Sequence, residues 1–127
     1  MYLHLSRIDV KPGDRVAAQV EKTPEALVLY LATLRAGMVF LPLNPAYQRH
    51  ELEYFLTDAT PGLVVCRPQM RGLIDELAKT AKVPNVLELD DSGKGSLIEA
   101  ATRLSSARSE SLYTYAKALR RITAGVI

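Results

Sequence analysis

The stretch DRVAAQVEKTPEALVLYLATLRAGMVFLPLNPAY, residues 14–47, decides the fold of the chain. Its first part repeats with a period of two, which is typical of a β-strand because successive side chains point to opposite faces. One face carries Val16, Ala18 and Val20, and the other carries Ala17, Gln19 and Glu21. The pattern predicts a strand over residues 16–20 with one face buried and the other partly polar.

A helix is expected directly after this strand. Thr23 offers a hydroxyl that caps backbone N–H groups, Pro24 suits the first turn because its missing donor costs nothing there, and Glu25 complements the positive helix end. Apolar residues then recur at helical spacing until Gly37, a residue type that commonly ends helices. The apolar run 38–43 predicts a second strand, covered on both faces and ended early by its proline.

Strands and helices continue to alternate after residue 47. Apolar stripes at helical spacing predict helices over residues 49–59 and 70–81, and short apolar runs predict strands over residues 63–66 and 86–89. Strands that alternate with helices of this length require crossover connections. The sequence therefore predicts an α/β fold: a small, mostly parallel, doubly wound sheet of about four strands with helices on both faces.

Length and composition indicate one domain. The chain has 127 residues, 48% of them hydrophobic, which suffices for one core but not for two ordinary domains. A single cysteine, Cys66, excludes an internal disulfide and fits a reducing compartment. Because the sequence contains neither a secretory signal nor a run of 18 apolar residues, we expect a cytoplasmic protein without a membrane partner.

Positive charge gathers in the C-terminal tail. Residues 103–127 carry a net charge of +4 and the first 102 residues −2. Tail residues at helical spacing form an apolar stripe: Leu112, Tyr115, Leu119, Ile122 and Val126. We therefore divide the chain into a subdomain, 1–104, and a divergent tail, 105–127, that forms a basic amphipathic helix.

Two interpretations of the tail remain open. Its helix docks its apolar side on the sheet with the charges outward, or its basic residues bind nucleic acid or an acidic membrane, with Tyr113 and Tyr115 available for stacking. Docking is favoured over nucleic acid, because the five basic residues come without a recognisable nucleic-acid-binding motif.

The segment Asp90-Asp91-Ser92-Gly93-Lys94-Gly95-Ser96 has the composition of a phosphate-binding loop but not its spacing. A P-loop ends in Gly-Lys-Ser/Thr, whereas Gly95 follows Lys94 here, and the two aspartates would repel an anion. Ser96 and Glu99 instead fit a capping box. We expect a turn and a capped helix, and phosphate binding is the less favoured alternative.

The cysteine and the two histidines are not expected to act as a nucleophile, as metal ligands or as members of a catalytic triad. Cys66 ends an apolar strand, where burial raises the pKa of a thiol, so a packing role is favoured over a nucleophilic one. His4 and His50 lie far apart in the sequence, without a partner at metal-ligand or catalytic-triad spacing.

The paired carboxylates are expected to be surface charges. Glu51 and Glu53 point apart on a helix, and Asp90 and Asp91 face water in a turn, so neither pair suits acid/base catalysis. We therefore predict that this chain has no catalytic, cofactor-binding or metal-binding residue.

Residues 11–84 resemble the N-terminal region of the adenylate-forming, AMP-dependent acyl-CoA synthetases, and most of all the malonyl-CoA synthetases. The strongest parts are Gly13-Asp14-Arg15-Val16, the helix from Pro24 to Gly37, and Leu41-Pro42-Leu43-Asn44-Pro45-Ala46-Tyr47. Gly93 to Thr102 is similar to malonyl-CoA synthetases as well. In the family this region builds a subdomain and carries none of the recognised catalytic residues.

The resemblance ends at Thr114. In the family a Tyr-Thr pair, similar to Tyr113-Thr114, introduces a Ser/Thr/Gly-rich loop that wraps the ATP phosphates. This chain continues instead with Tyr115-Ala116-Lys117-Ala118-Leu119. The intact family joins a carboxylate to CoA through an acyl-adenylate and uses ATP and magnesium.

The resemblance implies that this chain is a truncated N-terminal fragment of such a ligase, inactive alone and without a cofactor of its own. The alternative is a non-catalytic interaction module or a subunit of a split synthetase. Its partner would be a copy of itself or the remainder of a synthetase.

Overall fold

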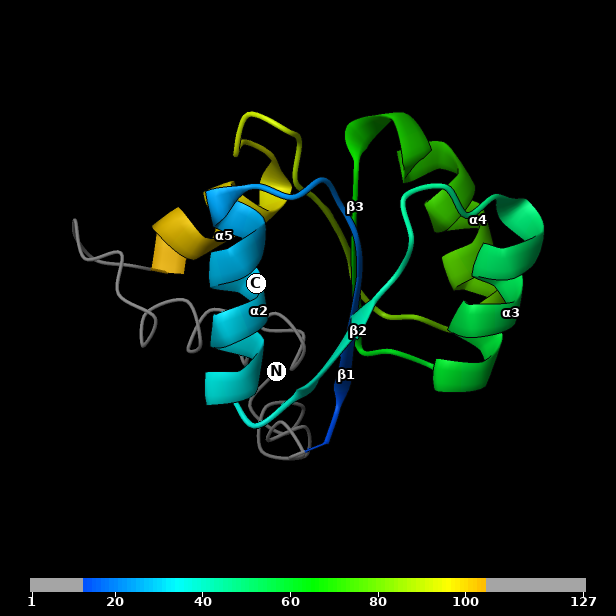
Figure 1. The fold of residues 1–127 in the computed structure, drawn as a ribbon. Helices are drawn as coiled ribbons and strands as arrows, with labels where there is room; N and C mark the ends of the chain where they lie inside the picture. Colours follow the sequence, from blue (N-terminus) through cyan, green and yellow to red (C-terminus); the bar gives the residue numbers. More distant parts are fainter. Residues whose placement is uncertain (1–12, 105–127) are drawn as a thin grey trace.

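The computed structural model describes residues 13–104, with side chains up to residue 100. Four parallel strands form one sheet in the order β2-β1-β3-β4 (Figure 1). The strands are β1 (Arg15–Gln19), β2 (Val39–Pro42), β3 (Leu63–Cys66) and β4 (Val86–Glu88). The predicted small parallel sheet of about four strands is confirmed.

The helices lie on both faces of this sheet. They are α2 (Pro24–Arg35), α3 (Arg49–Ala59), α4 (Arg71–Ala81), which follows the 3-10 turn η1 (Pro68–Met70), and α5 (Ser96–Leu104). In Figure 1, α2 and α5 lie on one face, and α3 and α4 lie on the other. The chain steps from β1 outward to β2 and then back past β1 to β3 and β4, so crossovers of one hand place α2 on one face and both α3 and α4 on the other. The doubly wound arrangement is thereby confirmed.

Local sequence signals set the bounds of α2. The Thr23 hydroxyl accepts a hydrogen bond from the backbone N–H of Ala26 at 3.1 Å, and Pro24 is the first helical residue. Gly37, two residues past the end of the helix, has φ +79°, a conformation that costs glycine little. Strand β2 follows two residues later, and this confirms the βαβ unit.

Two hydrophobic cores lie on the two sides of the sheet. The core under α2 and α5 includes Val16, Ala18, Leu29, Ala32, Leu63, Val65, Leu97 and Ala100. The core under α3 and α4 includes Ala17, Leu52, Leu56, Val64, Cys66, Ile74 and Leu77. Successive residues of β1 and β3 therefore alternate between two apolar cores. The prediction that only one face of the first strand is buried is wrong, because the face that carries the polar Gln19 is fully buried as well.

Strand β2 is less covered than its apolar sequence predicts. Within the described part of the chain it lies at one edge of the sheet, hydrogen-bonded to β1 alone. Val39 is 48% exposed, and Pro42 is also exposed. The prediction of a strand covered on both faces is therefore wrong for these residues, because an apolar run does not distinguish an edge strand from a central one.

Several predictions concern residues outside the described range. The basic helix over 105–127, the boundary that follows residue 104, and His4 all belong to this group. Within residues 13–104, no helix combines the length and the hydropathy that a membrane crossing requires.

Candidate functional site

The carboxyl ends of β1 and β3 meet where the strand order of the sheet reverses. In open α/β sheets this switch point is the usual place for functional side chains, because the loops after the two strands diverge to opposite faces. Gln19 ends β1, and Arg67 directly follows β3. The polar side chains at this edge of the sheet therefore form the first candidate site.

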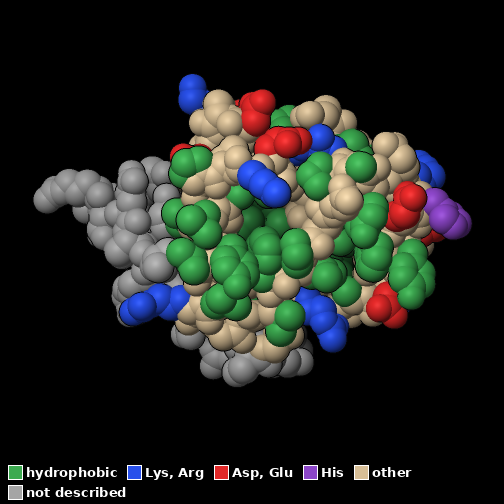
Figure 2. All heavy atoms as spheres, in the orientation of Figure 1, with side chains coloured by type: hydrophobic (Ala, Val, Ile, Leu, Met, Phe, Trp, Pro, Cys, Tyr) green, Lys and Arg blue, Asp and Glu red, His purple; other side chains and the backbone are tan. Residues whose placement is uncertain are grey.

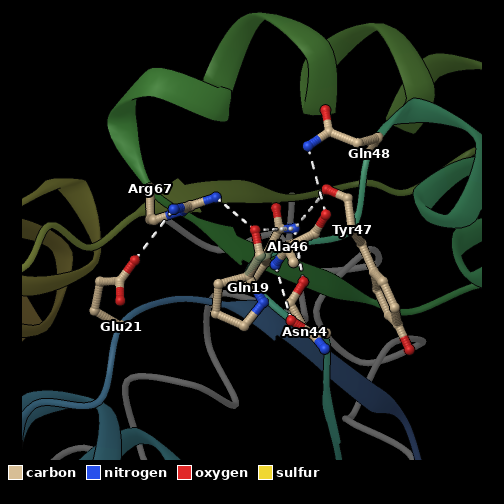
Figure 3. Close-up of polar contacts among 8 residues, drawn as sticks. Gln19, Glu21, Asn44, Ala46, Tyr47, Gln48 and Arg67 are labelled. Carbon is tan, nitrogen blue, oxygen red and sulfur yellow. Dashed lines mark hydrogen bonds and ion pairs between the residues drawn. The ribbon is translucent and has the colours of Figure 1, made fainter.

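Gln19 holds the loop that follows β2. Its Nε2 donates to the backbone oxygen of Asn44 at 3.0 Å and of Tyr47 at 3.2 Å, and more weakly to that of Pro45 at 3.5 Å. Figure 3 shows the amide reaching from β1 into the curve of this loop. One fully buried side chain thus fixes three carbonyl groups of the segment Asn44–Tyr47.

Arg67 contacts the same loop from β3. Its Nη2 donates to the backbone oxygen of Pro45 at 3.0 Å, and its Nη1 pairs with Glu21 at 3.1 Å (Figure 3). The guanidinium therefore links the segments that follow β1, β2 and β3. We call Gln19, Glu21, Arg67 and the loop Asn44–Tyr47 the Gln19 cluster.

The loop is also ordered from within. Asn44 Oδ1 accepts from the backbone N–H of Ala46 at 2.8 Å, and the Tyr47 ring stacks on Phe55 of α3 with centroids 5.2 Å apart. Two buried polar atoms of the cluster have no partner among the described residues: Gln19 Oε1, an acceptor, and Arg67 Nε, a donor. Most of the donors and acceptors are thus used to position the backbone. The Gln19 cluster is suited to holding a loop, and it contains no serine, cysteine or histidine that could act as a nucleophile.

Cys66 lies in the core under α4, as expected. It is fully buried, and burial raises the pKa of its thiol to about 12. The neighbouring cation Arg71 is engaged with Asp75 at 3.0 Å and with Glu88 at 3.1 Å. A thiol this hard to ionise is a poor nucleophile, so the predicted packing role is confirmed.

The loop before α5 is organised by Asp90 rather than by an anion. Asp90 Oδ1 accepts from the backbone N–H of Lys94 at 2.9 Å and from the hydroxyl and N–H of Ser92 at 2.8 and 2.9 Å. These hydrogen bonds lower the pKa of the Asp90 carboxyl. The carboxylate occupies the backbone donors that a phosphate would need, so the structure confirms the turn and argues against phosphate binding.

The predicted capping box at Ser96 and Glu99 is wrong. Ser96 Oγ accepts from the backbone N–H of Glu88 at 2.9 Å, so it joins the start of α5 to β4. A box-like contact occurs instead at α3, where Glu51 Oε1 accepts from the backbone N–H of Gln48 at 3.0 Å. Hydrogen bonds from the N–H groups of Glu51 and Gln48 lower the pKa of Glu51.

The remaining predicted candidates stay apart from the Gln19 cluster. His50 and Glu53 line an open depression on the outer side of α3 together with Tyr54, Thr57 and Asp58. Asp91 is exposed at the turn. Among the described residues, no three His, Cys, Asp or Glu side chains are grouped so that they could hold a metal ion.

Sequence reasoning misses the Gln19 cluster. A glutamine that ends an apolar strand and an arginine that directly follows another strand are the available signals, because parallel strands bring their carboxyl ends to one edge. The alternating pattern instead assigns Gln19 to a partly polar strand face, and it does not single out Arg67.

Comparison with known proteins identifies the family. Residues 3–121 match the family described as AMP-binding enzyme. Oxalate–CoA ligase of Arabidopsis thaliana is 30% identical over 110 residues, which cover 79% of this chain and 21% of the ligase. Tyrocidine synthase 2 of Brevibacillus parabrevis is 36% identical over 84 residues, which cover 66% of this chain and 2% of the synthase.

Solved structures agree with this assignment. ATP-bound MatB from Rhodopseudomonas palustris is 50% identical, with a TM-score of 0.72 over 83% of this chain and 22% of MatB. The chain thus spans about a fifth of the length of MatB and of the Arabidopsis ligase. The expected resemblance to the N-terminal part of the adenylate-forming acyl-CoA ligases is confirmed. The chain belongs to the AMP-binding enzyme family.

Proposed function

We propose that the chain contributes the scaffold of an acyl-CoA ligase similar to the malonyl-CoA synthetases, and that these residues alone do not activate a carboxylate. The observation that carries the proposal is the 50% identity to MatB over 83% of the chain. An intact ligase of this kind joins a carboxylate to CoA through an acyl-adenylate, with ATP and magnesium. Malonate is the substrate that the similarity favours.

Two features support a scaffolding role. Most polar groups of the Gln19 cluster are engaged in holding the loop Asn44–Tyr47. The family match continues to residue 121, but the segment after Thr114, Tyr115-Ala116-Lys117-Ala118-Leu119, lacks the Ser/Thr/Gly-rich pattern that the resemblance implies for a phosphate loop. Hydroxyls and flexible glycines wrap a triphosphate, whereas this segment offers one lysine among bulky and apolar residues.

The proposal is tested by ATP–pyrophosphate exchange with malonate, because exchange reports adenylation without the later CoA step. MatB from Rhodopseudomonas palustris serves as the active control. We expect no exchange above the enzyme-free background. Malonate-dependent exchange that copurifies with the 127-residue chain would overturn the proposal.

A second candidate function is that of an interaction module or a subunit of a split synthetase. It is favoured by one observation, the exposed apolar side chains on α2 and β2. Contiguous exposed apolar patches commonly mark protein interaction sites. The test mixes the chain with a separately expressed remainder of a synthetase and measures sedimentation and acyl-CoA formation. A larger complex with a gain of activity would support this function, and a strict monomer with no gain would reject it.

A further inference from the structure

The outer side of α2 carries an apolar surface. Exposed fractions are 57% for Leu27, 40% for Tyr30, 37% for Leu31 and 49% for Leu34, and Val39 of the neighbouring β2 is 48% exposed. We call these five residues the α2 face. Figure 2 shows hydrophobic side chains gathered over α2 and β2.

The helix is apolar on its inner side as well. Leu29 and Ala32 are buried against the sheet, and the buried Thr33 hydroxyl donates to the backbone oxygen of Leu29 at 2.7 Å. Away from the helix ends, α2 therefore has no charged residue and no polar side turned to water. A helix that is hydrophobic all round is typical of a buried helix, so the α2 face requires a cover.

The C-terminal tail follows a helix that packs beside α2. Leu97 and Ala100 of α5 share a core with Leu29 and Ala32 of α2. Figure 1 shows α5 beside α2 on the same side of the sheet. The chain continues from Leu104, the last residue of α5, through residues 105–127.

The tail sequence matches the α2 face in length, and its net charge is opposite in sign to that of residues 13–104. Its apolar stripe spans residues 112–126, about 22 Å as a helix, against about 18 Å for α2. Seven residues, the number in 105–111, can span at most about 25 Å when fully extended, which is long enough for a connection that reverses the chain direction. Residues 13–104 carry a net charge of −2, whereas Arg108, Lys117, Arg120 and Arg121 against Glu110 give the tail +3.

We propose that residues 112–126 form a helix that covers the α2 face of the same chain. The apolar stripe of the tail packs on Leu27, Leu31 and Leu34, and the basic residues of the tail point outward. The N-terminal segment, residues 1–10, is a poorer occupant, because its few apolar residues do not make a stripe of this length. This inference does not rest on the proposed ligase function. It competes with the second candidate function, because a tail helix on the α2 face would exclude a partner from the same side chains.

Cross-linking of engineered cysteines in the full chain tests the proposal. Leu31 lies near the middle of the α2 face, and Leu119 lies in the middle of the tail stripe. The double variant Leu31→Cys with Leu119→Cys is treated with a bismaleimide that spans roughly 8–10 Å, the usual distance between packed helices. The natural Cys66 is fully buried and does not compete. We expect a fast cross-link within one chain, at a rate independent of protein concentration.

Two matched pairs serve as controls. Leu31→Cys with Lys117→Cys uses the opposite side of the tail helix, and Tyr54→Cys with Leu119→Cys uses an exposed residue of α3 on the other face of the sheet. Both are expected to react roughly tenfold more slowly, since neither pair is held together. Equal rates for all three pairs would overturn the proposal.

Other occupants of the face give different results. Cross-linked dimers whose yield increases with protein concentration would assign the face to a second copy of the chain. A faster cross-link for Leu31→Cys with Leu5→Cys than for Leu31→Cys with Leu119→Cys would assign the face to the N-terminal segment. Either outcome overturns the proposal. Hydrogen exchange of the unmodified chain is independent of every variant. We expect amide exchange over residues 115–122 to be slowed roughly tenfold or more relative to an unfolded peptide, and unprotected amides there would refute docking.

Discussion

Replacing Gln19 by methionine tests how the loop after β2 is held. Gln19 is fully buried, and its Nε2 donates to the backbone oxygens of Asn44, Tyr47 and Pro45. Methionine keeps the length and nearly the volume of glutamine but has no N–H group. The variant therefore removes the donors and changes the packing little.

The expected loss follows from the partners that remain. The Asn44 oxygen still accepts from the backbone N–H of Tyr47 at 2.9 Å, and the Pro45 oxygen still accepts from Arg67 at 3.0 Å. The two shorter Gln19 bonds contribute about 1 kcal/mol each, and a buried carbonyl that loses its donor costs about 1–3 kcal/mol. Methionine also removes Gln19 Oε1, a buried acceptor without a partner among the described residues, and this removal offsets part of the destabilisation. We expect the free energy of unfolding to fall by about 2 kcal/mol.

Urea unfolding followed by circular dichroism measures this loss. Gln48→Met is the matched control, because Gln48 is exposed and its Nε2 donates to the Ala46 oxygen at a long 3.4 Å. The control should lose less than about 0.5 kcal/mol, with the same denaturant dependence in both variants. If Gln19→Met costs no more than Gln48→Met, the Gln19 cluster does not stabilise the loop as argued.

Four further predictions concern the rest of the fold. Gly95 has φ +140°, and a Cβ there would collide with the Glu88 carbonyl group, so Gly95→Ala should lower the free energy of unfolding by about 2 kcal/mol or more. Gly72→Ala in α4 meets open space and should raise it by about 0.5 kcal/mol; equal urea midpoints for the two variants would contradict this. Because burial raises the pKa of Cys66 to about 12, a thiol reagent at about pH 8 should label the protein only as fast as it opens, and immediate labelling would count against the structure. Hydrogen bonds from Lys94 and Ser92 hold the pKa of Asp90 in the folded protein below its ordinary 3.8. The contribution of the Asp90 carboxylate to the free energy of unfolding is therefore present above pH 3.8 and is lost as the pH falls through the pKa of the folded protein. The stability gap between the protein and Asp90→Asn should therefore shrink on acidification below about pH 4, and a gap that stays constant would be inconsistent with these bonds.

The fold was largely predictable from the spacing of apolar residues. The helix over residues 49–59 and the strand over 63–66 have the predicted bounds in the structure. In each element the apolar residues recur at the expected spacing, and Thr60-Pro61-Gly62 separates the two, so the spacing and the break predict the same boundaries. The cap at Thr23 was predictable for the same reason, because its hydroxyl acts within four residues.

The burial of a strand residue depends on the neighbouring strands and helices, which cannot be predicted from the sequence of the strand itself. Gln19 looks like a surface residue of an alternating strand, yet β1 lies between β2 and β3 and is covered by helices on both faces. The apolar run at β2 looks central, yet within the described residues it lies at the edge. Sheet order decides both cases, and it is set by crossovers rather than by the strand itself.

Contacts between separate elements also explain why the Gln19 cluster was not predicted and why the capping box at Ser96 was predicted wrongly. Gln19 and Arg67 are far apart in the sequence and meet because parallel strands end at one edge. Ser96 fits a capping pattern, but its hydroxyl is taken by the Glu88 N–H of the preceding strand. A contact between elements thus replaces the local one that the motif predicts.

Calorimetric titration of the chain with MgATP tests most directly the claim that these residues supply scaffold and not nucleotide chemistry. MatB from Rhodopseudomonas palustris, titrated in the same buffer, is the binding control. We expect no saturable heat from the chain up to about 1 mM nucleotide, a concentration that reveals any binding tighter than about −4 kcal/mol. Saturable binding with a micromolar Kd, mapped to residues 13–104 by hydrogen exchange, would contradict that claim.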